Sequence, residues 1–251
     1  MTGATLICAL LGATVTEAAR PHDPFIFRAV MREKARMVMI ALHTGLSVAY
    51  DAQTCGLYQA WRGGMQDGNA TYHHQNGGNR GATYYAKAKI TYWQKPGGEV
   101  GEDPAADTRE TSFSPKNEEL VPVWTAAQGG QPVAVKVSYQ GFTVNNATET
   151  ATLRYALVLP DGTRILVGET PEYAAVAGGV GLQRDFSFQG IPAGAGVALQ
   201  LTGNSVKKPD GTLVGDAWAV GSGSGKIEKR GGKDVLVQGA DGQTRITSGW
   251  R

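Results

Sequence analysis

The sequence contains little of what catalytic and metal-binding sites usually require. Among its 251 residues are only two cysteines and four histidines. No stretch matches G-x-S-x-G, a Walker phosphate loop, a dinucleotide fingerprint or H-E-x-x-H. A C-x-x-C-H stretch is also missing, so the chain cannot itself attach a c-type haem. We therefore expect no cofactor and no metal site.

Charge and long apolar runs are scarce as well. Charged residues make up 18% of the chain, and the net charge of +2 is spread over scattered Lys and Arg residues. Such a balance does not form the basic surface that nucleic acid requires, so we expect no nucleic-acid partner. The apolar run from Ala4 to Ala13 is too short to span a bilayer, which argues against a transmembrane anchor.

That same apolar run is followed by small residues up to Ala19, a pattern typical of a secretory signal peptide. We predict that residues 1–19 are a signal peptide and that the protein is periplasmic or secreted. A buried N-terminal strand or helix is the alternative. If the signal is removed, Cys55 is the only cysteine left, and no intramolecular disulfide can form.

Glycine is abundant, with 35 residues, and short apolar runs between turn formers recur along the chain. These features predict an all-β fold, an antiparallel β-sandwich or sandwiches built from meanders and hairpins with long Gly-rich loops. Between residues 36 and 61, the turns "HTG" and "DAQT" separate three strand-length runs. In this meander Leu46, Val48 and Tyr50 share one face, and Cys55, at the start of the third strand, is expected to point into the core.

The second half of the chain has the more regular turn signals. Pro160-Asp161-Gly162-Thr163 predicts a tight turn between two strands, and Asp210-Gly211 and Asp241-Gly242 predict further hairpins. One predicted strand carries Leu182, Arg184, Phe186 and Phe188. Because this set mixes apolar and charged residues, the sequence does not decide which face of the strand is buried. We predict an N-terminal β-meander region with long loops at 20–125 and a C-terminal β-sandwich region at 126–251, or one continuous domain across both.

His43, Asp51 and Cys55 lie close together in sequence and invite a catalytic interpretation. A thiol nucleophile needs a base within hydrogen-bond reach. In an antiparallel meander, however, His43 and Asp51 fall at opposite ends of one strand, roughly 17 Å apart at about 3.3 Å per residue. We therefore predict no catalytic residues in this cluster.

The residues between 62 and 118 are rich in Gly, Asn, Asp and Pro and predict long surface loops, where binding functions often lie. Consecutive histidines on an extended segment point to opposite sides, so His73 and His74 are expected to be polar loop residues and not a metal site. Aromatic residues gather in and near this region, and aromatic rings can stack on sugars. Packing in the core is the alternative role for these aromatic residues, including Trp124. The candidate ligand-binding residues are Trp61, Tyr72, His73, His74, Tyr84, Tyr85 and Trp93.

One long stretch, "RPHDPFIFRAVMREKARMVMIALHTGLSVAYDAQTCGLYQAWRGG" at residues 20–64, resembles a module of exported proteins from planctomycetes, verrucomicrobia and Bacteroidetes. In those proteins a similar H-D-P-aromatic-x-F-R segment, a "VAYD" element and "LYxAWxGG" open large chains with c-type cytochrome, sugar-dehydrogenase-like or ThuA-like domains. The stretches "LRYALVLPDGTRILVGETPEY" and "LQRDFSFQGIPAGAGVALQL" also resemble the hairpins of that module. The resemblance implies an extracytoplasmic, mostly β, non-catalytic module, and it brings no established active residues.

Three functions follow as expectations. The first is an exported, non-catalytic accessory module that binds a glycan or a partner protein carrying a haem c or sugar-dehydrogenase domain. The second is an enzyme of the redox or hydrolase class with a site in the 65–118 loops. The third is a structural or adhesive subunit.

Overall fold

The fold was determined as a computed structural model, which describes most of the chain. The described residues are 25–31, 34–43, 46–61, 65–67, 73–75, 78–80, 84–86, 122–176, 179–201, 206–207, 213–214 and 218–250. They contain strands and turns but no helix, and all strand pairs within them are antiparallel. The predicted all-β, antiparallel sandwich class is therefore confirmed. No helix suited to crossing a membrane occurs in these residues.

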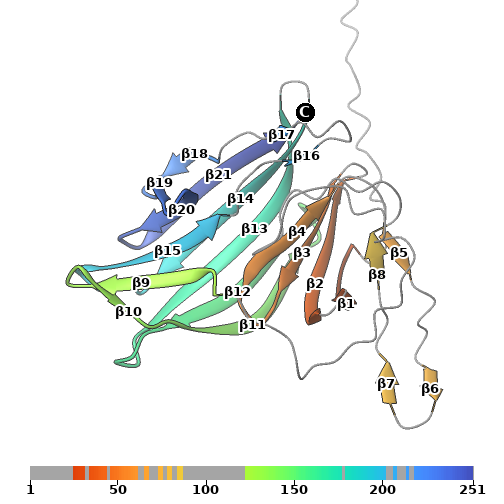
Figure 1. The fold of residues 1–251 in the computed structure, drawn as a ribbon, viewed down its shortest axis with the longest axis horizontal. Coiled ribbons are helices and arrows are strands. Elements are labelled where there is room, and N and C mark those ends of the chain that lie inside the picture. The colour runs from red at the N-terminus through yellow and green to blue at the C-terminus, as the bar shows by residue number, and fades with distance from the viewer. Residues whose placement is uncertain are drawn as a thin grey trace, which may run out of the picture.

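The N-terminal part forms a four-stranded meander, here called the meander sheet, in which each strand pairs with the next along the chain (Figure 1). Its strands are β1 (Ile26–Met31), β2 (Lys34–His43), β3 (Leu46–Asp51) and β4 (Gly56–Trp61). Leu46, Val48 and Tyr50 of β3 share one face, as predicted, and that face joins the main core. All six residues of β3 are buried, so this strand is covered on both faces.

The largest layer is a six-stranded sheet, here called the large sheet, with the order β11-β12-β13-β14-β21-β18. Its strands are β11 (Lys136–Asn145), β12 (Thr150–Val158), β13 (Arg164–Val176), β14 (Gly179–Gln189), β21 (Gly242–Trp250) and β18 (Ala219–Gly223). Residues of β12 and β13 alternate between buried and more exposed positions, which is typical of a sheet with one face against a core.

A third, five-stranded sheet has the order β10-β9-β15-β20-β19. Its strands are β10 (Gln131–Val133), β9 (Trp124–Gln128), β15 (Ala195–Leu201), β20 (Lys233–Gln238) and β19 (Lys226–Arg230). Three further pairs of short strands join β5 (Met65–Asp67) to β8 (Tyr84–Ala86), β6 (His73–Gln75) to β7 (Gly78–Arg80), and β16 (Val206–Lys207) to β17 (Leu213–Val214).

The meander sheet and the five-stranded sheet both pack on the buried face of the large sheet. Trp124 of β9 lies 5.7 Å from Tyr155 and 6.3 Å from Phe188 between ring centroids, and its Nε1–H donates to the carbonyl of Cys55 at 3.3 Å. One apolar cluster joins all three sheets. This core extends across the predicted boundary at 125/126, while the division into two regions itself stays a prediction.

Turn chemistry was predicted correctly at one position and wrongly at another. Gly162 has a φ of 86°, and the Leu159 N–H donates to the Thr163 carbonyl, so residues 160–163 form the expected tight turn between β12 and β13. Asp241-Gly242, in contrast, does not close a hairpin. The strands on either side, β20 and β21, belong to different sheets, so this turn carries the chain from one layer of the sandwich to the other. Asp210-Gly211 lies outside the described residues.

Candidate functional site

The predicted ligand-binding residues lie where the structure describes little beyond the backbone. Tyr72 and Trp93 are outside the described residues, as are most of the loops between 65 and 118. The others are placed on strands: Trp61 ends β4, His73 and His74 begin β6, and Tyr84 and Tyr85 begin β8. Their role in binding stays a prediction. Trp124, which belonged to the same aromatic group in the sequence, is only 3% exposed and packs in the core.

His43, Asp51 and Cys55 have separate environments. His43 is opposite Leu46 at the start of β3, and Asp51 is the last residue of β3, so the two lie at opposite ends of the strand, as predicted. The His43 ring stacks on Tyr173 with 4.0 Å between centroids. The Asp51 carboxylate accepts the Gln53 N–H at 2.8 Å.

Cys55 points into the core, as predicted, although it does not begin a strand. It is the last residue of the turn before β4 and has a φ of 50°, an unusual value for a non-glycine residue. Burial raises the pKa of its thiol far above the ordinary value, and the carboxylates of Glu169 and Asp51 raise it further. Because the thiolate is the reactive form, this buried thiol is a structural residue and a poor nucleophile.

A charged cluster lies inside the sandwich, between the meander sheet and the large sheet. Arg184 of β14 donates from Nε to Oε1 of Glu169 on β13 at 2.6 Å. The Tyr50 hydroxyl of β3 donates to the same oxygen at 2.6 Å, and the Tyr155 hydroxyl of β12 donates to Oε2 at 3.0 Å. Side chains from three strands therefore converge on the carboxylate that a fourth strand, β13, carries. We call these four residues the buried charge cluster.

The electrostatics of this cluster favour a fixed set of protonation states. Burial raises the pKa of Tyr50 and of Tyr155 well above the ordinary value, and the charge of Glu169 raises both further. Burial lowers the pKa of Arg184, but Glu169 and the tyrosines more than offset this, so its net pKa is raised. The tyrosines thus stay neutral and the arginine stays charged.

Aromatic rings enclose the guanidinium of Arg184. Its Cζ lies 5.0 Å from the ring centroid of Phe186, 5.7 Å from that of Trp218 and 5.9 Å from that of Tyr50. Such contacts stabilise a cation that has left water. Because the cluster is closed and its charges are matched within the chain, we assign it a structural role.

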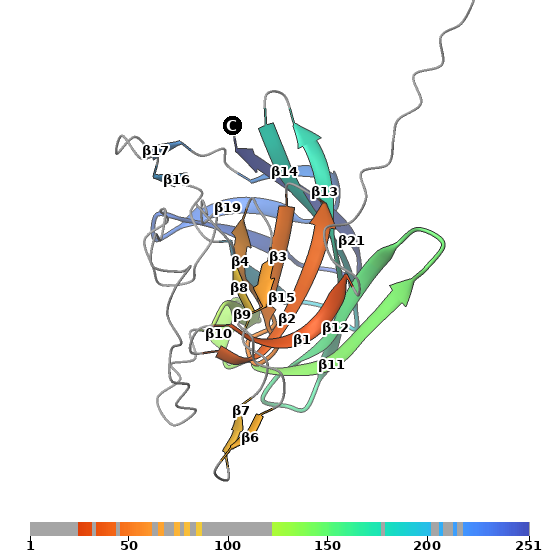
Figure 2. The same cartoon turned by 90° about the vertical axis from the view of Figure 1, so that its right-hand side faces the viewer.

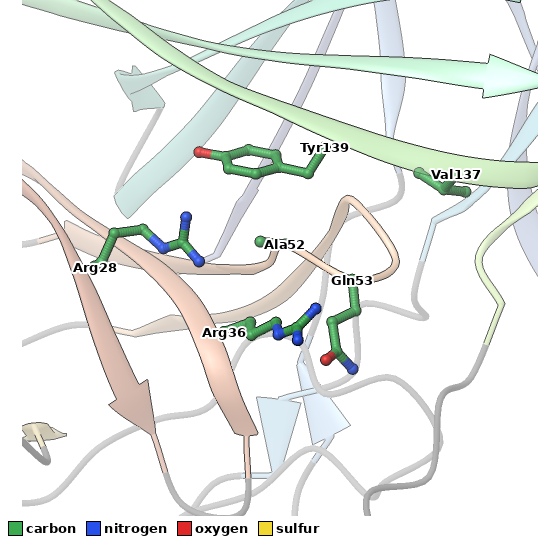
Figure 3. A pocket seen from close by; sticks show the side chains of 6 residues that line it. All are labelled: Arg28, Arg36, Ala52, Gln53, Val137 and Tyr139. Carbon is green, nitrogen blue, oxygen red and sulfur yellow. The ribbon is translucent and has the colours of Figure 1, made fainter. Parts of the chain in front are cut away.

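An open cleft of about 440 Å³ lies at the corner where the edge of the meander sheet meets β11 (Figure 3). Figure 2 shows β1 beside the β11–β12 hairpin at this corner. The cleft is lined by Arg28, Arg36, Ala52, Gln53, Val137 and Tyr139. We call it the basic cleft, because the described residues of its lining include two guanidinium groups and no carboxylate.

Strand pairing explains why the two arginines converge. Arg28 of β1 is opposite Val38 of β2, so both side chains are on the same face of the meander sheet. Arg36 lies two residues before Val38 and therefore shares that face, as a diagonal neighbour of Arg28 at roughly 7–8 Å between Cα atoms. Both arginines are exposed, and no described carboxylate forms an ion pair with either.

The remaining polar groups of the basic cleft are held in place. The Arg28 guanidinium lies over the face of the Tyr139 ring, with 5.5 Å from Cζ to the ring centroid (Figure 3). Burial raises the pKa of Tyr139, while Arg28 opposes that rise, so the phenol is neutral near pH 7 and can donate a hydrogen bond. Its hydroxyl oxygen is buried and has no hydrogen-bond partner among the described residues. The bond from the Gln53 N–H to Asp51 fixes the turn that presents the Gln53 amide.

A second cleft, of about 310 Å³, lies where the other end of the meander sheet meets the large sheet. Its lining includes Phe25, Leu42 and Tyr173 together with two carboxylates, Glu149 and Glu172. Glu172 accepts a hydrogen bond from the Gln183 amide at 2.8 Å, and Glu149 has a φ of 52°. Nowhere in the described part of the chain do three His, Cys, Asp or Glu side chains gather as metal ligands would.

The basic cleft was not predicted from the sequence. Four of its six residues, Arg28, Arg36, Ala52 and Gln53, fall within the stretch 20–64 that resembles the exported module. The two-residue period of side chains along a β-strand could have predicted that Arg28 and Arg36 lie on one face of the meander sheet. No sequence signal brings Tyr139, more than eighty residues away, to the same corner.

Comparison with known proteins adds no relative to this description. The chain matches no family model, no curated protein and no solved structure at a significant level.

Proposed function

We propose that this protein is an exported, non-catalytic accessory module that binds a partner protein or a glycan through the basic cleft. Its place of action is the periplasm or the extracellular space, beside a protein with a haem c or sugar-oxidising domain. The resemblance of residues 20–64 to modules of such proteins supports the location and the association, and most of the cleft lining lies in that stretch.

The observation that carries the proposal is the lining of the basic cleft. Arg28 and Arg36 project from neighbouring strands into one open hollow, with the side chains of Gln53 and Tyr139 beside them. A binding site usually combines a concave shape with a few placed polar groups. The cleft has both, whereas the cysteine that could have served as a nucleophile is buried and has a raised pKa.

Binding is tested with the protein from residue 20 onward, by titration of its intrinsic tryptophan fluorescence. The ligands are a panel of neutral and acidic polysaccharides and a set of extended peptides. We expect at least one of these ligands to bind, and the Arg28→Gln/Arg36→Gln double variant to bind it at least roughly tenfold more weakly. The matched control is Arg164→Gln/Lys233→Gln, which removes the same charge from exposed positions outside the cleft.

Two results would overturn the proposal. One is that no ligand of the panel binds, and the other is that every ligand binds the cleft variant as tightly as the native protein.

If a purified activity were found and lost in His73→Ala or His74→Ala, the enzyme hypothesis for the 65–118 loops would replace the binding proposal. Assembly of the purified protein into large oligomers would favour the structural or adhesive hypothesis.

A further inference from the structure

We propose that the ligand of the basic cleft is an acidic, extended peptide segment of a partner protein. This segment pairs with β11 as an added strand and places its carboxylates against Arg28 and Arg36. The inference rests on the proposed binding function of the cleft and specifies the class of ligand.

The cleft lies at the meeting point of two sheet edges. In the described part of the chain β11 pairs only with β12, and β1 pairs only with β2, so each strand has one edge without a hydrogen-bonded partner strand, and β8 lies close to β1. An edge strand presents backbone N–H and C=O groups at every second residue to any chain that lies alongside. Val137 and Tyr139 of β11 line the cleft, which brings this edge within reach of an occupant.

Strand β11 is a suitable template for an added strand. It is ten residues long, its pairing with β12 is irregular between Tyr139 and Gly141, and each of its residues is either partly or fully exposed. Recognition by strand addition draws affinity from backbone hydrogen bonds and specificity from the side chains that flank the edge. Here the flanking side chains are the two arginines.

The charge of the cleft selects an acidic occupant. Elsewhere in the chain Arg245 is paired with Asp185 at 2.6 Å and Arg230 with Glu228 at 2.8 Å, so these guanidinium groups already have a carboxylate. Arg28 and Arg36 have none among the described residues. A carboxylate from a partner would form charge-assisted, bidentate hydrogen bonds with them.

The spacing of the two arginines matches an extended peptide. Diagonal neighbours on a sheet face are roughly 7–8 Å apart, and residues i and i+2 of an extended chain are about 6.6 Å apart on the same side. A segment with acidic residues at alternate positions could therefore pair one carboxylate with each guanidinium.

The aromatic lining favours a peptide over a sugar. Sugar sites commonly offer an open aromatic face for stacking, but the Arg28 guanidinium lies over the ring of Tyr139, the aromatic residue among the described lining (Figure 3). Among the described lining residues, the apolar ones are Ala52 and Val137, which are small aliphatic side chains. Recognition by charge and by backbone pairing fits this lining better.

The test uses a synthetic ten-residue peptide, the length of β11, in which Asp alternates with Val or Thr. A matched peptide carries Asn in place of each Asp, and a polyuronate supplies the same carboxylates on a sugar chain. Affinities are measured by fluorescence anisotropy at low and high salt for the native protein, for Arg28→Gln/Arg36→Gln and for Arg164→Gln/Lys233→Gln. Circular dichroism verifies that each variant is folded.

We expect the Asp peptide to bind at least roughly tenfold more tightly than the Asn peptide, and salt to weaken its binding. The cleft variant should lose that preference, and the control variant should keep it within about twofold. Strand addition has its own signature. N-methylation of every second peptide residue should abolish binding in one register and spare it in the other, because only alternate N–H groups face β11.

The outcomes separate the two levels of the proposal. If the polyuronate binds through the cleft and the Asp peptide does not, the inference is overturned while the binding function stands. If both N-methylated registers bind equally, strand addition is wrong. If neither acidic ligand binds but a neutral polysaccharide does so in a cleft-dependent manner, the inference falls and the binding function again stands. If no ligand of either panel depends on the cleft, both fall.

Discussion

Arginine occupies two contrasting environments in this protein, one inside the sandwich and one at the corner between its sheets. Arg184 is about 1% exposed, bonded to Glu169 and enclosed by aromatic rings. Arg28 and Arg36 are exposed and share a hollow in which no described lining residue is a carboxylate. The first environment pairs its cation with a carboxylate of the chain and stabilises one packing of two sheets. The second leaves its cations available to another molecule.

This contrast can be tested by breaking the buried pair, which should produce the largest effect on stability. In Arg184→Met the Glu169 carboxylate stays buried without its cation, and we expect a loss of about 3–5 kcal/mol in the free energy of unfolding. Urea unfolding followed by tryptophan fluorescence measures the loss. The double variant Glu169→Leu/Arg184→Met removes both charges and should be less destabilised than the single variant, although the Tyr50 and Tyr155 hydroxyls lose their acceptor. If the two substitutions are simply additive, the pair does not act as a unit.

Alkaline pH should produce the next largest effect, because the pKa values of Tyr50, Tyr155 and Cys55 are all raised in the folded protein. The unfolded chain releases these protons near the ordinary values of 9.0 for the thiol and 10.0 for the phenols, while the folded chain retains them. Stability is therefore fully present below pH 9 and falls as the pH rises, by about 1 kcal/mol per pH unit for each group. Urea unfolding between about pH 7.5 and about pH 10.5 measures the slope.

The control for this prediction is Cys55→Ala, which removes the group that titrates first in the unfolded chain. Its loss of stability should begin about one pH unit later than that of the native protein. A stability that stays constant up to about pH 10.5 would mean that these side chains are not shielded from water as the structure indicates.

Much of the fold could be predicted from local patterns, because strand period and turn chemistry act over short distances. The alternation of Leu46, Val48 and Tyr50 identified residues that share a face, and Pro160-Asp161-Gly162-Thr163 identified a turn. The role of Asp241-Gly242 was mistaken, because turn residues specify a change of direction but not the sheet to which the next strand belongs. Sheet membership depends on contacts between distant parts of the chain.

The functional features were harder to predict for the same reason. Arg184 broke the apolar pattern of Leu182, Phe186 and Phe188, and this was the one local sign of a buried charge. Its partner Glu169 lies on a different strand, fifteen residues earlier, and the neighbouring tyrosines come from two more strands. The basic cleft likewise depends on the approach of β11 to β1, which no local pattern specifies.

The smallest effect on stability is expected at the basic cleft. Arg28→Gln and Arg36→Gln each replace an exposed cation that has no described carboxylate partner, so neither substitution leaves a buried group unsatisfied. The free energy of unfolding should change by less than about 0.5 kcal/mol in each single variant, as is usual for surface substitutions. The same urea measurement checks this against Arg184→Met. A loss of several kcal/mol in either cleft variant would mean that the arginine holds the meander sheet on β11, whereas an unchanged stability leaves ligand binding as the quantity that these side chains control.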